Sequence, residues 1–132
     1  MKITSSAELV SNALKEIKTI TPDEAYLKII EGKSNLIDIR DIRELQKEGR
    51  VEGAHHIPRG MLEFWLDPES SYYQENKIKD SKKMVLFCAL GFRSALATKA
   101  LTDMGFKNVA NANGGFDALK NAGLEVVIKE KK

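Results

Sequence analysis

The chain has 132 residues, a formal net charge of +2, and 42% hydrophobic and 30% charged residues. These values are typical of one globular unit, and so small a charge argues against nucleic acid or a membrane surface as partner. The single cysteine excludes an internal disulfide, and no apolar run predicts a transmembrane helix. The first residues lack the apolar core of a signal peptide, so we expect a cytoplasmic location. We expect a single domain over residues 1–132, with a helical extension at 1–17 and a frayed charged tail at 129–132.

Apolar residues recur at helical spacing from residue 6 to 17, which predicts the first helix. A second helix begins with a threonine cap, a proline and a glutamate at Thr21-Pro22-Asp23-Glu24 and ends near Glu31. Strands are expected at 18–20, 35–39, 54–57, 83–88 and 108–111, further helices at 41–47, 60–66, 94–104 and 116–121, and a polar surface excursion at 69–80.

Strands alternate with helices along the whole chain. This order predicts an α/β fold with a mostly parallel central sheet of about five strands and helices on both faces. In such sheets ligands bind beyond the carboxyl ends of the strands, where Asp38, Pro58 and Cys88 are expected to lie.

Cys88 ends the most hydrophobic predicted strand and precedes the loop Ala89-Leu90-Gly91-Phe92-Arg93-Ser94. A thiol at this point lies near the positive end of the following helix, and the amides of a tight loop converge on it. Both effects favour the thiolate, which is the nucleophilic form. The alternative is a buried core cysteine followed by a plain turn, which accounts for Gly91 but not for Arg93.

Four segments together resemble the rhodanese-like domain family. Their order and spacing match over residues 18 to 127. The segments are Leu36-Ile37-Asp38-Ile39-Arg40 with Glu44 following, Gly53-Ala54-His55-His56-Ile57-Pro58, Val85-Leu86-Phe87-Cys88-Ala89-Leu90-Gly91-Phe92-Arg93-Ser94 and Asn113-Gly114-Gly115-Phe116.

The resemblance implies a rhodanese-like three-layer fold and a sulfurtransferase that needs neither metal nor cofactor. Cys88 would take the outer sulfur of a small anionic donor such as thiosulfate and hold it as a persulfide. It would then pass the sulfur to cyanide, a thiol or a partner protein. The amides of Ala89 to Ser94 would stabilise the charged terminal sulfur.

The chain departs from the family pattern at several positions. Gly49-Arg50-Val51 lacks the histidine that often precedes the third strand, Leu119 replaces a common tryptophan, and Glu125 replaces a common proline. The loop interior from Ala89 to Phe92 carries no charge, whereas thiosulfate-preferring members often place a cation there. The physiological donor therefore stays open.

Other residues expected near the site can be interpreted as either structural or functional. Asp38 and Arg40 suit a structural salt bridge, and the functional alternative has Asp38 orienting Arg93 or the loop amides. Arg59 is expected at the pocket rim, either binding an anionic donor or solvated at the surface. On a strand His55 and His56 point to opposite faces, so they cannot act together.

Three other functions compete with that of a sulfurtransferase. A persulfide carrier needs the same loop, so the sequence does not separate it from a sulfurtransferase. A phosphatase or arsenate reductase is disfavoured, because cysteine phosphatases place arginine six positions after the cysteine and Arg93 follows Cys88 by five. A non-catalytic binding module is disfavoured because the cysteine and its loop are both present.

Overall fold

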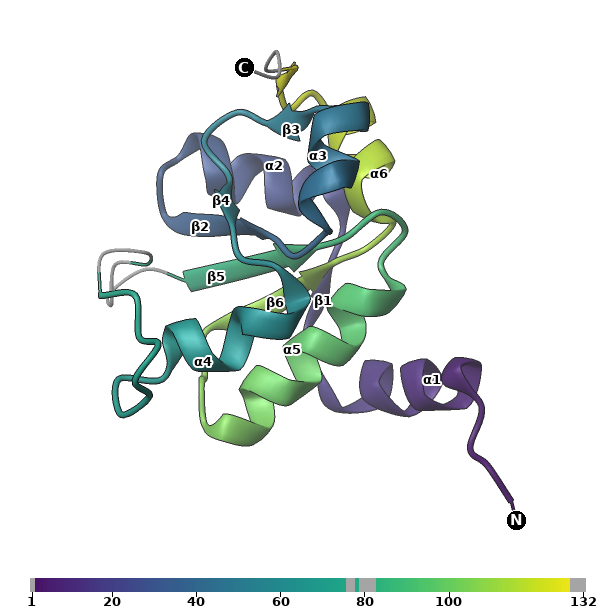
Figure 1. Cartoon of the computed structure of the whole chain (residues 1–132). Helices are drawn as coiled ribbons and strands as arrows, with labels where there is room; N and C mark the ends of the chain where they lie inside the picture. Colours follow the sequence, from purple (N-terminus) through teal and green to yellow (C-terminus); the bar gives the residue numbers. More distant parts are fainter. Residues whose placement is uncertain (1, 76–77, 79–82, 129–132) are drawn as a thin grey trace.

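The computed structural model describes residues 2–75, 78 and 83–128 (Figure 1). The expected tail at 129–132 and part of the excursion at 69–80 lie outside these ranges. The helices are α1 (Ser6–Glu16), α2 (Pro22–Ile30), α3 (Ile42–Glu48), a 3-10 turn (Arg59–Met61), α4 (Leu62–Leu66), α5 (Phe92–Met104) and α6 (Gly115–Ala122). The strands are β1 (Thr19–Ile20), β2 (Ser34–Asp38), β3 (Arg50–Val51), β4 (His55–His56), β5 (Lys83–Phe87), β6 (Val109–Ala112) and β7 (Val126–Val127).

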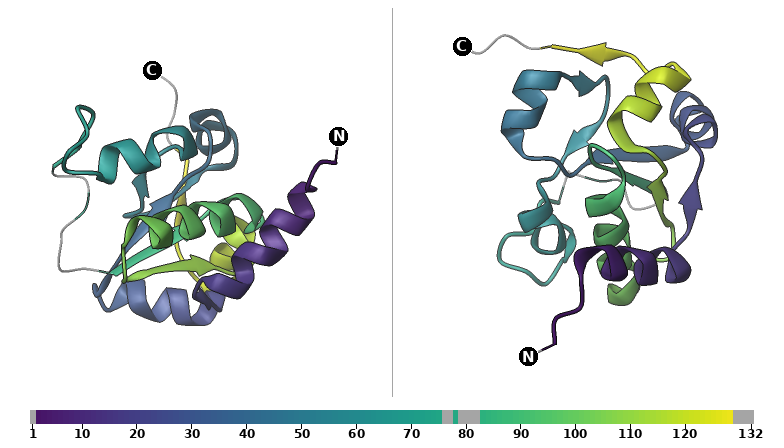
Figure 2. Two further views of the ribbon diagram at one scale, coloured as in Figure 1. Left: turned by 90° about the horizontal axis from the view of Figure 1, so that it is seen from below. Right: turned by 90° about the vertical axis from the view of Figure 1, so that its right-hand side faces the viewer.

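The central sheet has five strands in the order β1-β6-β5-β2-β4, and every neighbouring pair is parallel. In Figure 1, α1, α4 and α5 cover one face, and α2, α3 and α6 cover the other. Figure 2 shows α1 lying across α5, against which it buries Val10 and Ala13. The predicted α/β fold with a parallel sheet between helices is therefore confirmed.

The buried side chains of β5 alternate between two hydrophobic clusters, one on each face of the sheet. Val85 and Phe87 pack with residues of α2 and α6. Met84, Leu86 and Cys88 pack with residues of α4 and α5. This alternation is the period of a strand buried on both faces, and it puts the Cys88 side chain on the side of α5.

Local sequence signals set the starts of two helices. The capping boxes Thr21–Glu24 and Asp41–Glu44 both form, with each side chain bonded to the other residue's backbone N–H. The helix expected at 60–66 is instead divided into the 3-10 turn (Arg59–Met61) and α4 (Leu62–Leu66).

Two features differ from the sequence expectation. Strands β3 and β7 form a small antiparallel pair that the sequence did not predict, because each has two residues and their partners are far apart in the chain. Helix α5 begins at Phe92, two residues before the expected start, since Gly91 adopts a left-handed conformation as its cap. Within the described residues, no helix is both long and apolar enough to cross a bilayer.

Candidate active site

Cys88 lies directly after β5, in the connection to α5, and is only 1% exposed. Gly91 closes this connection with φ of 102°, a conformation that other residues adopt at a cost. A Cβ at Gly91 would also lie 3.3 Å from the Gly114 nitrogen. The tight turn places the first turn of α5 next to the cysteine. The N–H groups of a first helical turn have no partner within the helix and can donate elsewhere.

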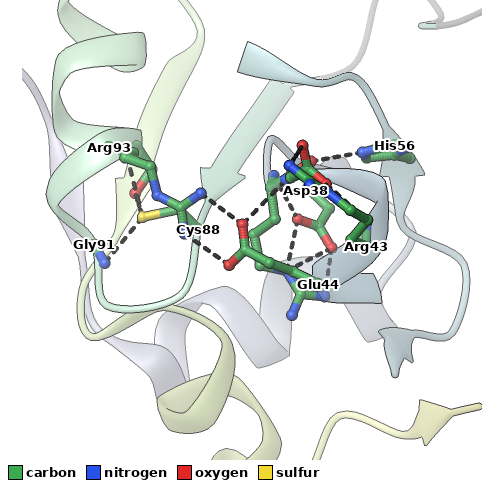
Figure 3. A network of polar contacts seen from close by, with 10 residues as sticks. Asp38, Arg43, Glu44, His56, Cys88, Gly91 and Arg93 are labelled. Carbon is green, nitrogen blue, oxygen red and sulfur yellow. Dashed lines mark hydrogen bonds and ion pairs between the residues drawn. The ribbon is translucent and has the colours of Figure 1, made fainter. Parts of the chain in front are cut away.

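The Cys88 sulfur is held by backbone donors and by a buried polar chain (Figure 3). The N–H groups of Gly91 and Ser94 donate to Sγ at 3.1 and 3.3 Å. The thiol donates to Ser94 Oγ at 3.4 Å, and Ser94 Oγ donates to Asn111 Oδ1 at 2.6 Å. Donors fixed in the backbone stabilise negative charge on the sulfur without having to reorganise.

The glycine turn after β6 supports the cysteine loop from behind. The N–H of Phe116 donates to the carbonyl oxygens of Cys88 and Ala89, at 2.8 and 3.2 Å. Gly115 has φ of +68°, and a Cβ there would lie 2.6 Å from the Cys88 oxygen. The close approach of the two backbones therefore requires glycine.

Arg93 points away from α5 and forms a two-pronged ion pair with Glu44 of α3. Its Nη1 and Nη2 donate to the two carboxylate oxygens at 2.7 and 2.9 Å. This hydrogen bonding is the main reason that the pKa of Glu44 is lowered and that of Arg93 is raised. Cys88 also contributes to the raised pKa of Arg93 through its charge, so the guanidinium lies within electrostatic reach of the cysteine. Figure 3 shows the pair between Arg93 and Glu44. The pair fixes a positive charge near the cysteine and ties its loop to α3.

Asp38 and Arg40 form a buried salt bridge at the end of β2. Both side chains are 1% exposed, and Arg40 Nη2 lies 2.8 Å from Asp38 Oδ2. Arg40 also donates to the Gly49 carbonyl at 2.9 Å and lies over the Phe116 ring, 4.1 Å from its centre. The structural salt bridge expected for Asp38 and Arg40 therefore forms. The hydrogen bonds of Arg93 go to Glu44, so the alternative in which Asp38 orients Arg93 is not what the structure shows.

The remaining candidates lie around this arrangement. Arg59 donates to Glu63 at 2.7 Å, an ion pair within one helical turn, and none of the contacts found among the described residues joins its side chain to the cysteine loop. His56 Nε2 lies 2.7 Å from the Arg40 carbonyl oxygen, so its bond is to the backbone of the β2 loop.

The rim of the loop is apolar. Leu90 and Phe92 are 61% and 60% exposed. Leu90 lines a cavity of about 490 Å³ together with basic and acidic residues, among them Arg43, Lys47 and Glu48. In the part of the chain that the structure describes, no three His, Cys, Asp or Glu side chains are grouped so that they would hold a metal.

Sequence reasoning missed Asn111 and the partner of Arg93. Asn111 is 2% exposed in β6, so a polar residue inside a buried strand was the available signal. Glu44 was noted only for its place in the family pattern, and nothing local shows that a residue 49 positions away binds it.

Comparison with known proteins agrees with this geometry. Residues 21–122 match the model of the rhodanese-like domain. The chain is 29% identical over 133 residues to rhodanese-like domain-containing protein 17 of Arabidopsis thaliana, covering 92% of this chain and 81% of that protein.

Two solved structures are similar to nearly the whole chain. A Rhodopseudomonas palustris protein of unknown function, described as a possible tyrosine phosphatase, is 39% identical with a TM-score of 0.87, covering 96% of this chain and 98% of that one. A polysulfide-sulfur transferase homodimer from Wolinella succinogenes is 32% identical with a TM-score of 0.71, covering 92% and 85%. By its fold, its cysteine loop and these relatives, the chain belongs to the rhodanese-like domain family.

Proposed function

We propose that the protein is a sulfurtransferase that carries sulfur as a persulfide on Cys88. The observation that supports this most directly is the pair of backbone N–H donors, from Gly91 and Ser94, directed at the Cys88 sulfur. A terminal persulfide sulfur is a small anion, and fixed amides at a helix start suit such a charge.

The reaction has two half-reactions. The Cys88 thiolate attacks the outer sulfur of a sulfane donor, a new S–S bond forms, and the old bond breaks with its electron pair leaving on the donor remnant, which is sulfite for thiosulfate. A cyanide or thiolate acceptor then attacks the terminal sulfur, and the electron pair of the broken bond returns to Cys88. The donor remnant leaves before the acceptor binds, and the sulfur stays on Cys88 in between, so ping-pong kinetics follow.

The loop favours donors that do not depend on a cation inside it. Leu90 and Phe92 present apolar surface at its rim, and Arg93 is already paired with Glu44. A polysulfide chain, which is named for the Wolinella succinogenes relative, combines apolar sulfur atoms with terminal charge and suits this rim. We therefore expect polysulfide to load Cys88 faster than thiosulfate does.

Intact mass spectrometry tests the proposal. The purified chain is mixed with polysulfide or thiosulfate, freed of excess donor and weighed, with Cys88→Ser as the matched control. We expect the mass of one sulfur atom to be added to the parent only and to be lost on adding cyanide. Absence of any adduct with both donors would overturn the proposal.

A phosphatase assay separates the competing reaction. A phosphate ester needs an arginine that faces the loop, whereas the Arg93 guanidinium here is bound to Glu44. We expect no hydrolysis of an aryl phosphate above that of Cys88→Ser. Turnover by the parent alone would favour the phosphatase.

A further inference from the structure

A small basic cavity lies at the edge of the sheet opposite to Cys88. It has a volume of about 60 Å³, and its lining includes Lys18, Lys28, Ser34, Lys83, Lys107 and Asn108. Ser34 and Lys83 open the neighbouring parallel strands β2 and β5, and they are paired in register. Since Cys88 follows the other end of β5, the strand separates this cavity from the cysteine loop (Figure 1).

The charge around the cavity is positive. Four lysines line it, and none of the described residues in its lining carries a carboxylate. None of the ion pairs formed among the described residues includes Lys18, Lys28, Lys83 or Lys107. Ammonium groups that converge without a counter-charge raise the local concentration of anions.

Ser34 adds an independent signal. Its side chain is 8% exposed, and its hydroxyl is buried without a hydrogen-bond partner. A buried hydroxyl left in this state is costly and is rare in folded proteins. The same residue lines the small cavity, so an unpartnered donor lies next to the space that the four lysines also line.

A wider depression adjoins the cavity. Its lining would surround the part of a ligand that lies outside the small cavity. It has a volume of about 670 Å³ and shares Lys28, Ser34 and Lys83 with the cavity. Apart from those shared residues it is lined by Glu24, Leu27, Glu31 and Lys33. Its described lining thus holds two carboxylates and three lysines, of which Lys33 is paired with Glu31. The carboxylates accept hydrogen bonds from hydroxyls.

We propose that this edge of the sheet binds a small phosphate monoester. The phosphoryl group occupies the cavity between the lysines and accepts the hydrogen bond of the Ser34 hydroxyl. The uncharged, hydroxyl-bearing remainder lies in the depression beside Glu24 and Glu31. The site is independent of the sulfur chemistry at Cys88.

Amide NMR of the full chain tests the site, because both edges of the sheet are visible in one titration. Glycerol 3-phosphate, inorganic phosphate and a nucleoside triphosphate are added in turn at constant ionic strength. We expect saturable shifts at Ser34, Lys83 and Val109, with the monoester binding more tightly than the other two. Shifts confined to Gly91 and Ser94, or shifts that do not saturate, would overturn the proposal, and tighter triphosphate binding would refute the monoester assignment.

Two variants sharpen the test. Ser34→Ala is expected to weaken monoester binding about tenfold, the value of one hydrogen bond to a charged group. Its melting temperature without ligand should equal or exceed that of the parent, because an unpartnered hydroxyl is removed. Lys47→Gln, at the other edge of the sheet, is the control and should bind as the parent does. Equal affinity of Ser34→Ala and the parent would contradict the assigned hydrogen bond.

Discussion

The loops after β2 and β5 leave neighbouring parallel strands at the same edge of the sheet, with Asp38 and Phe87 in register. A buried side chain that can carry negative charge lies at each of these strand ends, Asp38 at one and Cys88 at the other. The two side chains differ in the partners that bind them. Asp38 is paired with the side chain of Arg40. Cys88 accepts hydrogen bonds from the backbone N–H groups of Gly91 and Ser94.

The difference shows what makes a buried group structural or reactive. Arg40 gives Asp38 a full counter-charge through Nε and Nη2, and Nη2 also donates to the Gly49 carbonyl, so both carboxylate oxygens of Asp38 are bonded to the guanidinium. The backbone donors at Cys88 stabilise charge but carry no full charge of their own, and a sulfur keeps lone pairs for attack. Burial alone does not distinguish the two loops, whereas the kind of partner does.

Breaking the β2 loop should have the largest effect on stability. Arg40→Met leaves Asp38 as an unpaired buried charge and is expected to cost about 3–5 kcal/mol of unfolding free energy. Urea denaturation measures this cost. Arg43→Met, which removes an exposed pair with Asp41, is the matched control and should leave the midpoint nearly unchanged. Equal midpoints for the two variants would show that the buried pair is not what holds this loop.

The second largest effect on stability is expected at Gly115, whose backbone packs against that of the cysteine loop. Gly115→Ala places a Cβ 2.6 Å from the Cys88 oxygen. We expect a loss of about 1–3 kcal/mol from overpacking, with about 1–2 kcal/mol more for the left-handed backbone, and slower persulfide formation. Gly32→Ala has nearly the same φ, +69° against +68°, and open space around it, so it isolates the backbone cost. If the two variants lose equal stability and activity, the close approach is not required.

The side chain of Ser94 should matter less for persulfide formation than its backbone N–H does. Ser94→Ala leaves Asn111 Oδ1 buried without its donor and is expected to cost about 1–3 kcal/mol. Because the Ser94 N–H remains, Cys88 should still accept sulfur, unlike in Cys88→Ser. Chemical denaturation and intact mass give the two readouts, with the exposed Ser11→Ala as control. Complete loss of loading in a folded Ser94→Ala would place the essential donor on the side chain.

Weakening the exposed ion pair between Arg93 and Glu44 should have the smallest effect on stability. Glu44→Gln weakens the pair with Arg93, whose side chain is 45% exposed, so the cost at neutral pH is less than about 1 kcal/mol. The pKa of Glu44 in the folded protein lies below its ordinary value of 4.5, so the pair stabilises the fold above that value. Its contribution is lost as pH falls through the lowered pKa. The stability difference between parent and Glu44→Gln should therefore shrink between neutral pH and pH 3, and a difference that grows in acid would contradict this.

Local signals carried much of the prediction because they act over a few residues. The cap at Thr21 and the apolar strand before Cys88 were read correctly, since capping and burial patterns lie within one element. The start of α5 was placed two residues late, because a glycine cap has no side-chain signature. The β3–β7 pair was missed because two-residue strands carry no periodicity.

The sequence by itself determined the order of elements, the parallel sheet and the position of Cys88 at a strand end, since hydrophobic periodicity and turn residues encode these locally. Only the tertiary structure decided that Glu44, and not Asp38, binds Arg93, and that Ser94 links Cys88 to Asn111 by hydrogen bonds. It also decided that Ser34 lines one cavity with four lysines. These contacts join residues distant in the chain. Their partners are chosen by strand order and helix packing, which no short stretch of sequence specifies.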